Sequence, residues 1–333
     1  MSYARRGQRH SETKLLTLNQ PQLNATQKPL PEDPQCLQIM SFTSSTLPYS
    51  NLSSLNTLTL HLPASPPQSA QGIWLICIHG GAWCDPFITS TCFDATLKHL
   101  LSSSPASHIS GIASLNYRLS SYPSHPTDPS SPHDPARNAK HPDHITDVLT
   151  AILFLQDKYK FGDRYILIGH SCGATLAFQV AKKRYWGKQY ESTEALELNV
   201  ESPLAIIGVE GIYDLPNFVS EYAHEPFYRG FVEHAFGRDE AVWKEASVAD
   251  VDWEESWTEG REVVIVHSED DKLVSLKQPE RMWKALGERG WKDDEGAERR
   301  RRFVKLKDLD HDEVWEDGKA LAEVIGEVIG RLT

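Results

Sequence analysis

The residues best placed for chemistry are a serine and the glycines that flank it. Residues 169–173 read Gly-His-Ser-Cys-Gly; an apolar, β-favouring run precedes them from residue 165, and residues 174–182 have a helical composition. A strand, a sharp turn and a helix in this order are typical of a nucleophile elbow, which presents a serine hydroxyl to a base. Glycines at both ends allow such a tight turn. We therefore interpret Ser171 as a nucleophile; the alternative is an ordinary strand–helix turn that happens to contain a serine.

A serine nucleophile needs a general base, and the base needs an orienting carboxylate. His311 is the only histidine after His267 and follows the last predicted strand, so we predict that it is the base rather than a surface histidine. Two acids compete for the orienting role, Asp270 and Asp271. Asp271 lies four residues after His267 and three before a valine, a spacing that favours it. Asp270 would then be a solvated loop charge.

A third motif, His79-Gly80-Gly81-Ala82-Trp83, directly follows the apolar run 73–78. The negative charge that develops on an attacked carbonyl oxygen needs preorganised N–H donors, and glycines let a backbone approach the substrate closely. Lipases and esterases place a histidine–glycine–glycine loop at this point for that purpose. The predicted oxyanion donors are the backbone N–H groups of Gly80, Gly81, Ala82 and Cys172.

The elements that must position these residues alternate between strands and helices. We predict strands over residues 55–62, 73–78, 111–119, 165–168, 205–211, 262–268 and 303–306, and helices over 93–101, 144–159, 174–182, 278–286 and 321–332. Such alternation predicts an α/β fold with a mostly parallel central sheet and helices on both faces. Ligands bind such sheets at the carboxyl ends of the strands, where all the candidate residues lie.

The remaining segments are less regular. Residues 212–250 are rich in aromatic residues, and we interpret them as a helical cap over the site; the alternative is a peripheral helical insertion without ligand contact. Residues 120–141 predict a loop. We predict that residues 1–45 are a partly disordered extension and that residues 46–333 form a single domain. Within the extension, residues 15–18 are either a short strand or an apolar tail. The basic cluster 299–302 is interpreted as a solvated charged turn.

Composition narrows the function. The chain has 333 residues and a formal net charge of −12, which argues against nucleic acid or an anionic membrane as its main partner. It has no apolar run of transmembrane length and no apolar segment behind its polar, basic first residues. Five cysteines without a zinc-site spacing indicate free thiols in a reducing compartment, so we expect a cytoplasmic protein without a metal or cofactor.

The His-Gly-Gly-Ala-Trp motif of residues 79–83 resembles the kynurenine formamidases, and residues 169–174 resemble their elbow. Residues 116–119 and 136–144 are similar to the fungal branch of that family, and residues 210–214 and 267–278 also resemble it. The similarity extends from about residue 49 to the C-terminus. It implies an α/β-hydrolase fold and an arylformamidase that hydrolyses N-formyl-L-kynurenine in tryptophan degradation, toward NAD synthesis. Residues 120–133 depart from the family pattern, which affects the geometry of a lid rather than the chemistry.

Alternatives stay open at this point. A short-chain carboxylesterase with an HGGG or HGGA loop would carry the same catalytic residues, and a catalytically silent hydrolase-fold binding protein would usually lack one of them. Trp83 could fill the acyl side of the pocket and exclude groups larger than formyl, or it could pack under the loop for stability. The sequence is compatible with a homodimer but does not fix the oligomeric state, and it does not identify the residues that hold the amino-acid end of a substrate.

Overall fold

Continuous apolar runs form the centre of the sheet because both of its faces are covered. In β3 (Ile73–Ile78), alternate side chains enter two separate hydrophobic cores, with Ile73, Leu75 and Cys77 in one and Trp74, Ile76 and Ile78 in the other. The computed structural model describes residues 41–65, 72–182 and 200–333. The expectations for residues 1–40, including a strand at residues 15–18, lie outside the described residues.

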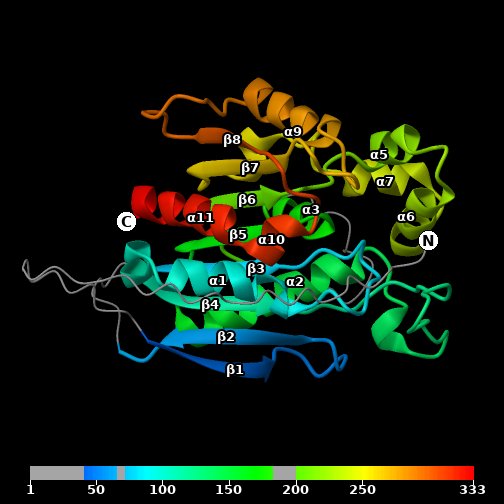
Figure 1. Cartoon of the computed structure of the whole chain (residues 1–333), viewed down its shortest axis with the longest axis horizontal. Helices are drawn as coiled ribbons and strands as arrows, with labels where there is room; N and C mark the ends of the chain where they lie inside the picture. Colours follow the sequence, from blue (N-terminus) through cyan, green and yellow to red (C-terminus); the bar gives the residue numbers. More distant parts are fainter. Residues whose placement is uncertain (1–40, 66–71, 183–199) are drawn as a thin grey trace, which may run out of the picture. The chain divides into compact units, whose positions relative to one another are not determined.

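The described residues form one eight-stranded sheet with the order β1-β2-β4-β3-β5-β6-β7-β8 (Figure 1). Strand β2 is antiparallel to β1 and β4, and all other neighbours are parallel. The mostly parallel sheet predicted from the sequence is therefore confirmed. Besides β3, the strands are β1 (Phe42–Pro48), β2 (Thr57–Pro63), β4 (Ile109–Leu115), β5 (Tyr165–His170), β6 (Ala205–Val209), β7 (Glu262–Ser268) and β8 (Arg300–Leu306).

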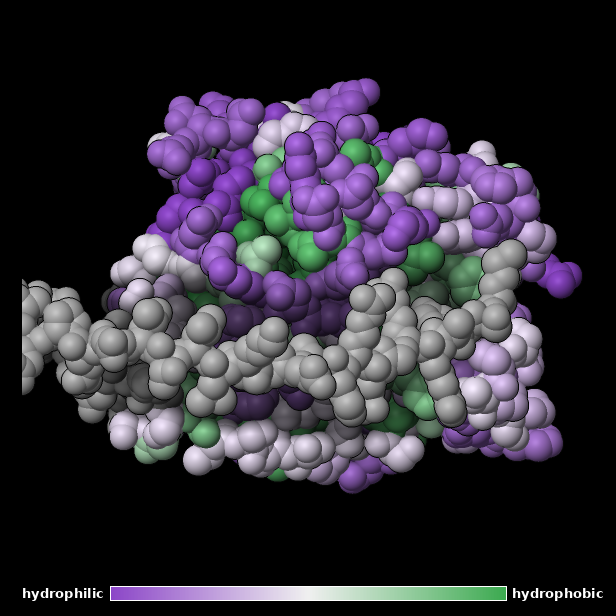
Figure 2. Space-filling view, in the orientation of Figure 1, coloured by the Kyte–Doolittle hydropathy of each residue, from purple (hydrophilic) through white to green (hydrophobic). Residues whose placement is uncertain are grey.

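Amphipathic helices cover the two faces of this sheet, as expected for its doubly apolar strands. One core takes side chains from α1 (Asp94–Leu101), α10 (Glu313–Asp317) and α11 (Lys319–Leu332); the other takes them from α2 (Asp143–Tyr159), α3 (Cys172–Val180) and α9 (Lys277–Glu288). Hydrophilic residues cover much of the face seen in Figure 2, around α9 and β8, and leave a smaller hydrophobic area visible. Among the described residues, no helix is both long and apolar enough to span a membrane.

Residues 212–250 contain helices, as predicted. They are α5 (Leu215–Glu221), α6 (Pro226–Phe236) and α7 (Glu240–Ala246), which gather at one end of the sheet in Figure 1. A further short helix, α8 (Trp253–Ser256), follows them. The predicted loop at residues 120–141 is irregular apart from a single 3₁₀ turn at Pro135–Arg137.

Two boundaries differ from expectation. The prediction of a solvated turn at residues 299–302 is wrong, because Arg300 to Arg302 begin the edge strand β8 and are half-buried. Their side chains extend aliphatic stems along the protein, and the Arg301 guanidinium lies 3.9 Å from the ring centre of Trp283. Strand β1 begins at Phe42, inside the segment predicted as an extension, and pairs with β2. The division of the chain into domains otherwise stays a prediction.

Candidate active site

The turn after β5 holds Ser171 in a conformation that favours glycine, with φ 53° and ψ −120°. The turn is also crowded. A Cβ atom at Gly169 would lie 2.2 Å from the carbonyl oxygen of Gly173, and one at Gly173 would lie 2.3 Å from the carbonyl oxygen of Ile78. Glycine is therefore required on both sides of the serine. The N–H of Ser171 donates to Val209 O at 2.8 Å, which fixes the turn against β6. This geometry is the sharp strand–helix turn predicted from the sequence.

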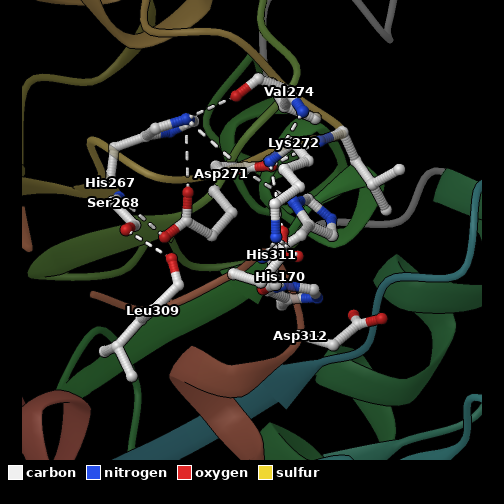
Figure 3. Close-up of polar contacts among 12 residues, drawn as sticks. His170, His267, Ser268, Asp271, Lys272, Val274, Leu309, His311 and Asp312 are labelled. Atoms are coloured by element: carbon white, nitrogen blue, oxygen red, sulfur yellow. Dashed lines mark hydrogen bonds and ion pairs between the residues drawn. The ribbon is translucent and has the colours of Figure 1, made fainter. Parts of the chain in front are cut away.

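Asp271 and His311 meet at the carboxyl ends of β7 and β8. His311 Nδ1 lies 2.8 Å from Asp271 Oδ2, and both side chains are buried (Figure 3). The other carboxylate oxygen of Asp271 accepts the N–H groups of Leu273 and Val274 at 2.7 and 2.9 Å. Burial acts to raise the pKa of Asp271, but the hydrogen bond and charge of His311, aided by the other donors, hold that pKa well below its usual range. Asp271 is thus an ionised acceptor for the imidazole.

Asp270, the competing acid, is used differently. Its Oδ2 accepts the N–H of Asp308 at 2.7 Å on an exposed loop, and its side chain does not bond to His311. Of the two candidates, the structure therefore joins Asp271 to the histidine, in agreement with the spacing.

His311 is also tied to the elbow itself. His170 precedes the serine, and its Nε2 donates to the carbonyl oxygen of His311 at 3.1 Å, with the two rings 4.7 Å apart. Within the described residues, no hydrogen bond joins the Ser171 hydroxyl to the His311 ring. Such bonds are often long in unliganded sites and tighten when a substrate binds.

The loop after β3 lies directly against this elbow. A Cβ atom at Gly80 would come within 2.7 Å of His170 Nδ1 and 3.0 Å of the Ser171 Cβ. Gly81, Ala82 and Trp83 follow with φ values of 87°, 49° and 60°. Left-handed backbone costs a non-glycine residue roughly 1–2 kcal/mol, so this loop stores strain beside the serine.

Hydrogen bonds hold the strained loop in place. The buried hydroxyl of Tyr117 donates to the carbonyl oxygens of His79 and Gly80, at 3.0 and 3.2 Å. The N–H of Trp83 donates to Cys172 Sγ at 3.2 Å. Cys172 is the first residue of α3, and the first N–H groups of a helix have no partner within the helix. Among the described residues, its backbone N–H donates no hydrogen bond to another residue, whereas that of Trp83 is in use.

Sequence and structure comparisons agree on the relatives of this chain. The family model BD-FAE matches residues 58–286. A kynurenine formamidase-like hydrolase of Fusarium equiseti is 41% identical over 298 residues, which are 86% of this chain and 95% of the relative. A kynurenine formamidase of Aspergillus versicolor is 40% identical over 228 residues, 63% of this chain and 74% of that protein. This chain belongs to the kynurenine formamidase family.

Comparison with solved structures shows the fold of this chain. An inhibited esterase B of Lactobacillus rhamnosis has a TM-score of 0.64 at 15% identity, with 89% of this chain and 88% of that chain covered. A truncated carbohydrate esterase from gut microbiota has a TM-score of 0.56 at 19% identity, with 88% and 98% covered. At these identities the likeness shows the fold, and the chain has the α/β-hydrolase fold.

Helix α6 of this formamidase-family chain packs against the loop after β3. The ring of Trp83 is fully buried and packs edge-on against Phe236 of α6, with ring centres 4.9 Å apart. Tyr222 and Tyr228 stack 4.1 Å apart; burial raises the pKa of both, and the charge of Asp271 adds to the shift. The contact of Phe236 with Trp83 brings the aromatic segment against the loop beside Ser171, which favours the cap interpretation. Contact with a ligand stays a prediction, as does a role of Trp83 in selecting the acyl group.

Sequence reasoning assigned no role to three buried residues of the site, Tyr117, His170 and Glu210. Each lies within two residues of the carboxyl end of a central strand, and that position was the one available signal. Burial lowers the pKa of the loop histidine His79 to about 4, although its contact with the Gly80 carbonyl opposes the shift. His79 is therefore neutral, and its ring stacks on Tyr117 with centres 4.4 Å apart. It acts as part of the loop's support.

Histidines and carboxylates converge closely enough here for a metal site to be considered. The nearest ligand-type atoms of Glu210, Asp271 and His311 all lie within 4.8 Å of one another. His311 Nδ1 and Asp271 Oδ2 are, however, joined to each other by a direct hydrogen bond. We therefore do not identify these residues as metal ligands.

Proposed function

We propose that this chain is a serine hydrolase that converts N-formyl-L-kynurenine and water to L-kynurenine and formate. Ser171 is the nucleophile, His311 the general base and acid, and Asp271 the residue that orients His311. The observation that carries the proposal is the buried 2.8 Å contact of Asp271 with His311, beside the elbow of a kynurenine formamidase-family chain. The order serine, aspartate, histidine along the chain is the one that this fold uses.

The reaction proceeds in two halves. His311 takes the proton of Ser171 as the hydroxyl attacks the formyl carbon, and the resulting tetrahedral oxyanion carries the negative charge. His311 then gives the proton to the aryl nitrogen, the C–N bond breaks, and kynurenine leaves with a formyl ester on Ser171. Water, deprotonated by His311, attacks this ester; formate leaves and Ser171 regains its proton.

The proposed oxyanion donors are the backbone N–H groups of Gly80, Gly81, Ala82 and Cys172. The position of the loop supports this proposal, because Gly80 lies directly against the serine: a Cβ atom there would come within 3.0 Å of the Ser171 Cβ. Cys172 contributes the free first N–H of α3. Each such donor is worth about 3–4 kcal/mol of transition-state stabilisation in related acyl-transfer sites.

Selectivity for formyl follows from the small size of its acyl substituent, which is a hydrogen atom. We propose that Trp83, whose ring is fully buried and packs edge-on against Phe236 of α6, borders the acyl side of the pocket and keeps it small. The leaving group is aromatic, and the segment from α5 to α6 is rich in rings of the kind that stack on such a group, among them the stacked pair Tyr222 and Tyr228. We further propose a place in tryptophan degradation toward NAD synthesis, in the cytoplasm, with a small-molecule substrate.

The test supplies N-formyl-L-kynurenine, N-acetyl-L-kynurenine and p-nitrophenyl acetate in parallel and follows product absorbance. We expect efficient release of kynurenine from the formyl compound and little from the acetyl compound. Ser171→Ala is the matched control; its kcat should fall by ~10⁶, on the scale of a triad nucleophile. Rapid cleavage of the ester without release from either kynurenine derivative would assign the chain to the carboxylesterases. No turnover and no labelling by a fluorophosphonate would instead indicate a silent binding protein.

A further inference from the structure

The carboxyl ends of three neighbouring strands carry Ser171, Glu210 and His267 side by side. The strand residues that immediately precede them are paired in register between β5, β6 and β7. The ladder continues one step further, because Ser171 N–H donates to Val209 O and Glu210 N–H donates to Val266 O, at 2.8 and 2.9 Å. Glu210 therefore occupies the position between the serine and the strand that leads to Asp271, and no step of the proposed reaction uses it.

Placing a glutamate at position 210 costs folding free energy. It is fully buried, and its φ of 48° lies in the left-handed region. That backbone costs a side chain about 1–2 kcal/mol, and a glycine would adopt it freely. An unpaired carboxylate without solvent would add a large desolvation cost. The contacts of the side chain must therefore offset both.

The two oxygens of the carboxyl group are treated differently by their surroundings. Oε1 accepts the N–H of Ser268 at 2.8 Å. Oε2 is buried, finds no hydrogen-bond donor among the described residues, and lies 3.2 Å from His267 Nε2. That nitrogen lies 2.8 Å from the carbonyl oxygen of Val274, which can only accept. The imidazole hydrogen is therefore directed to Val274 and is not available to Glu210.

Asp271 approaches the same nitrogen, with its Oδ2 3.4 Å from His267 Nε2. A carboxylate oxygen of Asp271 also lies within 4.8 Å of one of Glu210, and two buried carboxylates this close cannot both be ionised. A proton on Oε2 of Glu210 resolves both problems, because the orphaned atom becomes a donor and Asp271 gains a hydrogen bond. Burial and the neighbouring Asp271 raise the pKa of Glu210 well above its usual range, which agrees with a proton on Glu210.

We propose that Glu210 is a positioning residue that stays protonated and donates a hydrogen bond to Asp271, which it holds against His311. The inference rests on the proposed roles of Asp271 and His311. The Asp271 carboxylate then receives four donors, from Leu273, Val274, His311 and Glu210. Sharing its charge among them limits how strongly Asp271 stabilises the protonated form of His311. Glu210 thereby favours an imidazole that is free to accept a proton.

Other titratable and polar groups face Glu210, and they must stay unchanged in the variants if a pH profile is to report Glu210 alone. Asp271, His267 and Ser268 contribute from β7 and its loop; His311 and Asp310 contribute from the segment after β8, where Lys272 binds Asp310. His170 faces it from β5, and the buried hydroxyl of Tyr213 from the turn after β6. A change confined to Glu210 leaves all of them in place, so a shift in pH dependence reports this one side chain.

The first test compares Glu210→Leu with Glu210→Gln through the pH dependence of kcat/KM. Leucine keeps the volume but removes the donor, so the acid limb should move to higher pH by about half a unit to one unit, with kcat/KM lower by ~10-fold or more. Glutamine can donate to Asp271 and accept from Ser268. It should restore the wild-type acid limb and recover most of the lost kcat/KM. Loss of activity in both variants with an unmoved acid limb would overturn the proposal and leave a purely structural role.

The second test measures protonation without any substrate, and it also serves if the leucine variant does not fold. A free glutamate ionises near pH 4.3, so folding with a protonated Glu210 takes up a proton between that pH and its raised pKa in the folded protein, and the contribution of Glu210 to stability declines as pH rises through this window. Glutamine needs no proton. The urea midpoint of Glu210→Gln, relative to wild type, should therefore increase between pH 5 and pH 9. A constant difference would show that Glu210 is ionised in the folded protein.

These arms separate the inference from the proposed function. The pH profile can be measured with p-nitrophenyl acetate if formylkynurenine is not turned over, and the unfolding series needs no turnover. Failure of the substrate assignment thus leaves the Glu210 result readable.

Discussion

Two buried aspartates in this molecule bind nitrogen donors at almost the same distance but serve different purposes. Asp147 of α2 accepts Arg118 at 2.9 Å, and Asp271 accepts His311 at 2.8 Å; the aspartate side chains are 4% and 1% exposed. Arginine keeps its charge at every relevant pH, whereas histidine changes charge near neutrality. The first pair is therefore a permanent link between α2 and the segment after β4. The second can take up and release a proton.

The hydrogen-bond partners of Asp147 and Asp271 also differ. Arg118 binds Asp147 through its backbone N–H, Nε and a terminal nitrogen, so both carboxylate oxygens are occupied by one partner. Asp271 divides its oxygens between two loop N–H groups and a histidine, and the proposed hydrogen bond from Glu210 would add a fourth donor. Identical side chains thus become a structural link or part of a reaction site according to whether the partner titrates.

The largest effect that separates the pairs is expected from Asp271→Asn. An amide cannot orient the imidazole in the tautomer that accepts the serine proton, so kcat should fall by ~10⁴. Asp270→Asn is the matched control: the amide oxygen can still accept the Asp308 N–H, and kcat should change little. Steady-state kinetics on the formyl substrate decide between them. A larger loss in the Asp270 variant would reverse the assignment.

The same substitution at the other aspartate should act on stability instead. Asp147→Asn leaves the partly buried guanidinium of Arg118 without its full counter-charge, and breaking a fully buried pair costs about 3–5 kcal/mol of unfolding free energy. Arg118 also approaches the more exposed Asp143 at 3.3 Å, which places the expected loss at the lower end. Urea unfolding should detect it, while kcat of the folded fraction stays near wild type. A fall in kcat without a loss of stability would contradict the assignment of the Asp147–Arg118 pair to a purely structural role.

Much of the site was predictable because its signals are local. The elbow occupies five consecutive residues, the glycine loop directly follows β3, and the spacing between His267 and Asp271 distinguishes two adjacent acids. Alternation of apolar strands and amphipathic helices likewise predicted the sheet.

What could not be predicted depends on contacts between distant segments. Glu210 meets Asp271 only through the register of β6 against β7, which no local pattern specifies. The run Arg300 to Arg302 resembles a solvated turn because its charges conceal a strand. Two of those residues are accommodated at a sheet edge by the ring of Trp283 and by Glu327, which lie elsewhere along the chain. The support of the glycine loop by the Tyr117 hydroxyl is a contact of the same kind.

The smallest expected effect concerns that hydroxyl. Tyr117→Phe removes the donor to the His79 and Gly80 carbonyls but keeps the ring that stacks on His79. The buried His79 carbonyl then loses this donor, which costs about 1–3 kcal/mol of stability, whereas the Gly80 carbonyl keeps its contact with His79 Nδ1 at 3.0 Å. Because those carbonyls belong to the strained loop, its N–H groups should also lose alignment with the developing oxyanion. We expect kcat to fall by ~10-fold, equivalent to about 1.4 kcal/mol, with KM nearly unchanged.

Tyr49→Phe provides the control for this prediction. Its hydroxyl is also buried and donates to a carbonyl, that of Asn116 at 2.8 Å, but this contact lies outside the glycine loop. The control should lose stability on a similar scale and keep its kcat. If both variants lost stability and neither lost kcat, the loop would hold its shape without Tyr117, and the strain at residues 81–83 would have to be balanced by the contact of Trp83 with Cys172 and by the cap. If kcat falls in the Tyr117 variant alone, the Tyr117 hydroxyl contributes to the reaction as Asp271 does, because it holds the shape of the glycine loop.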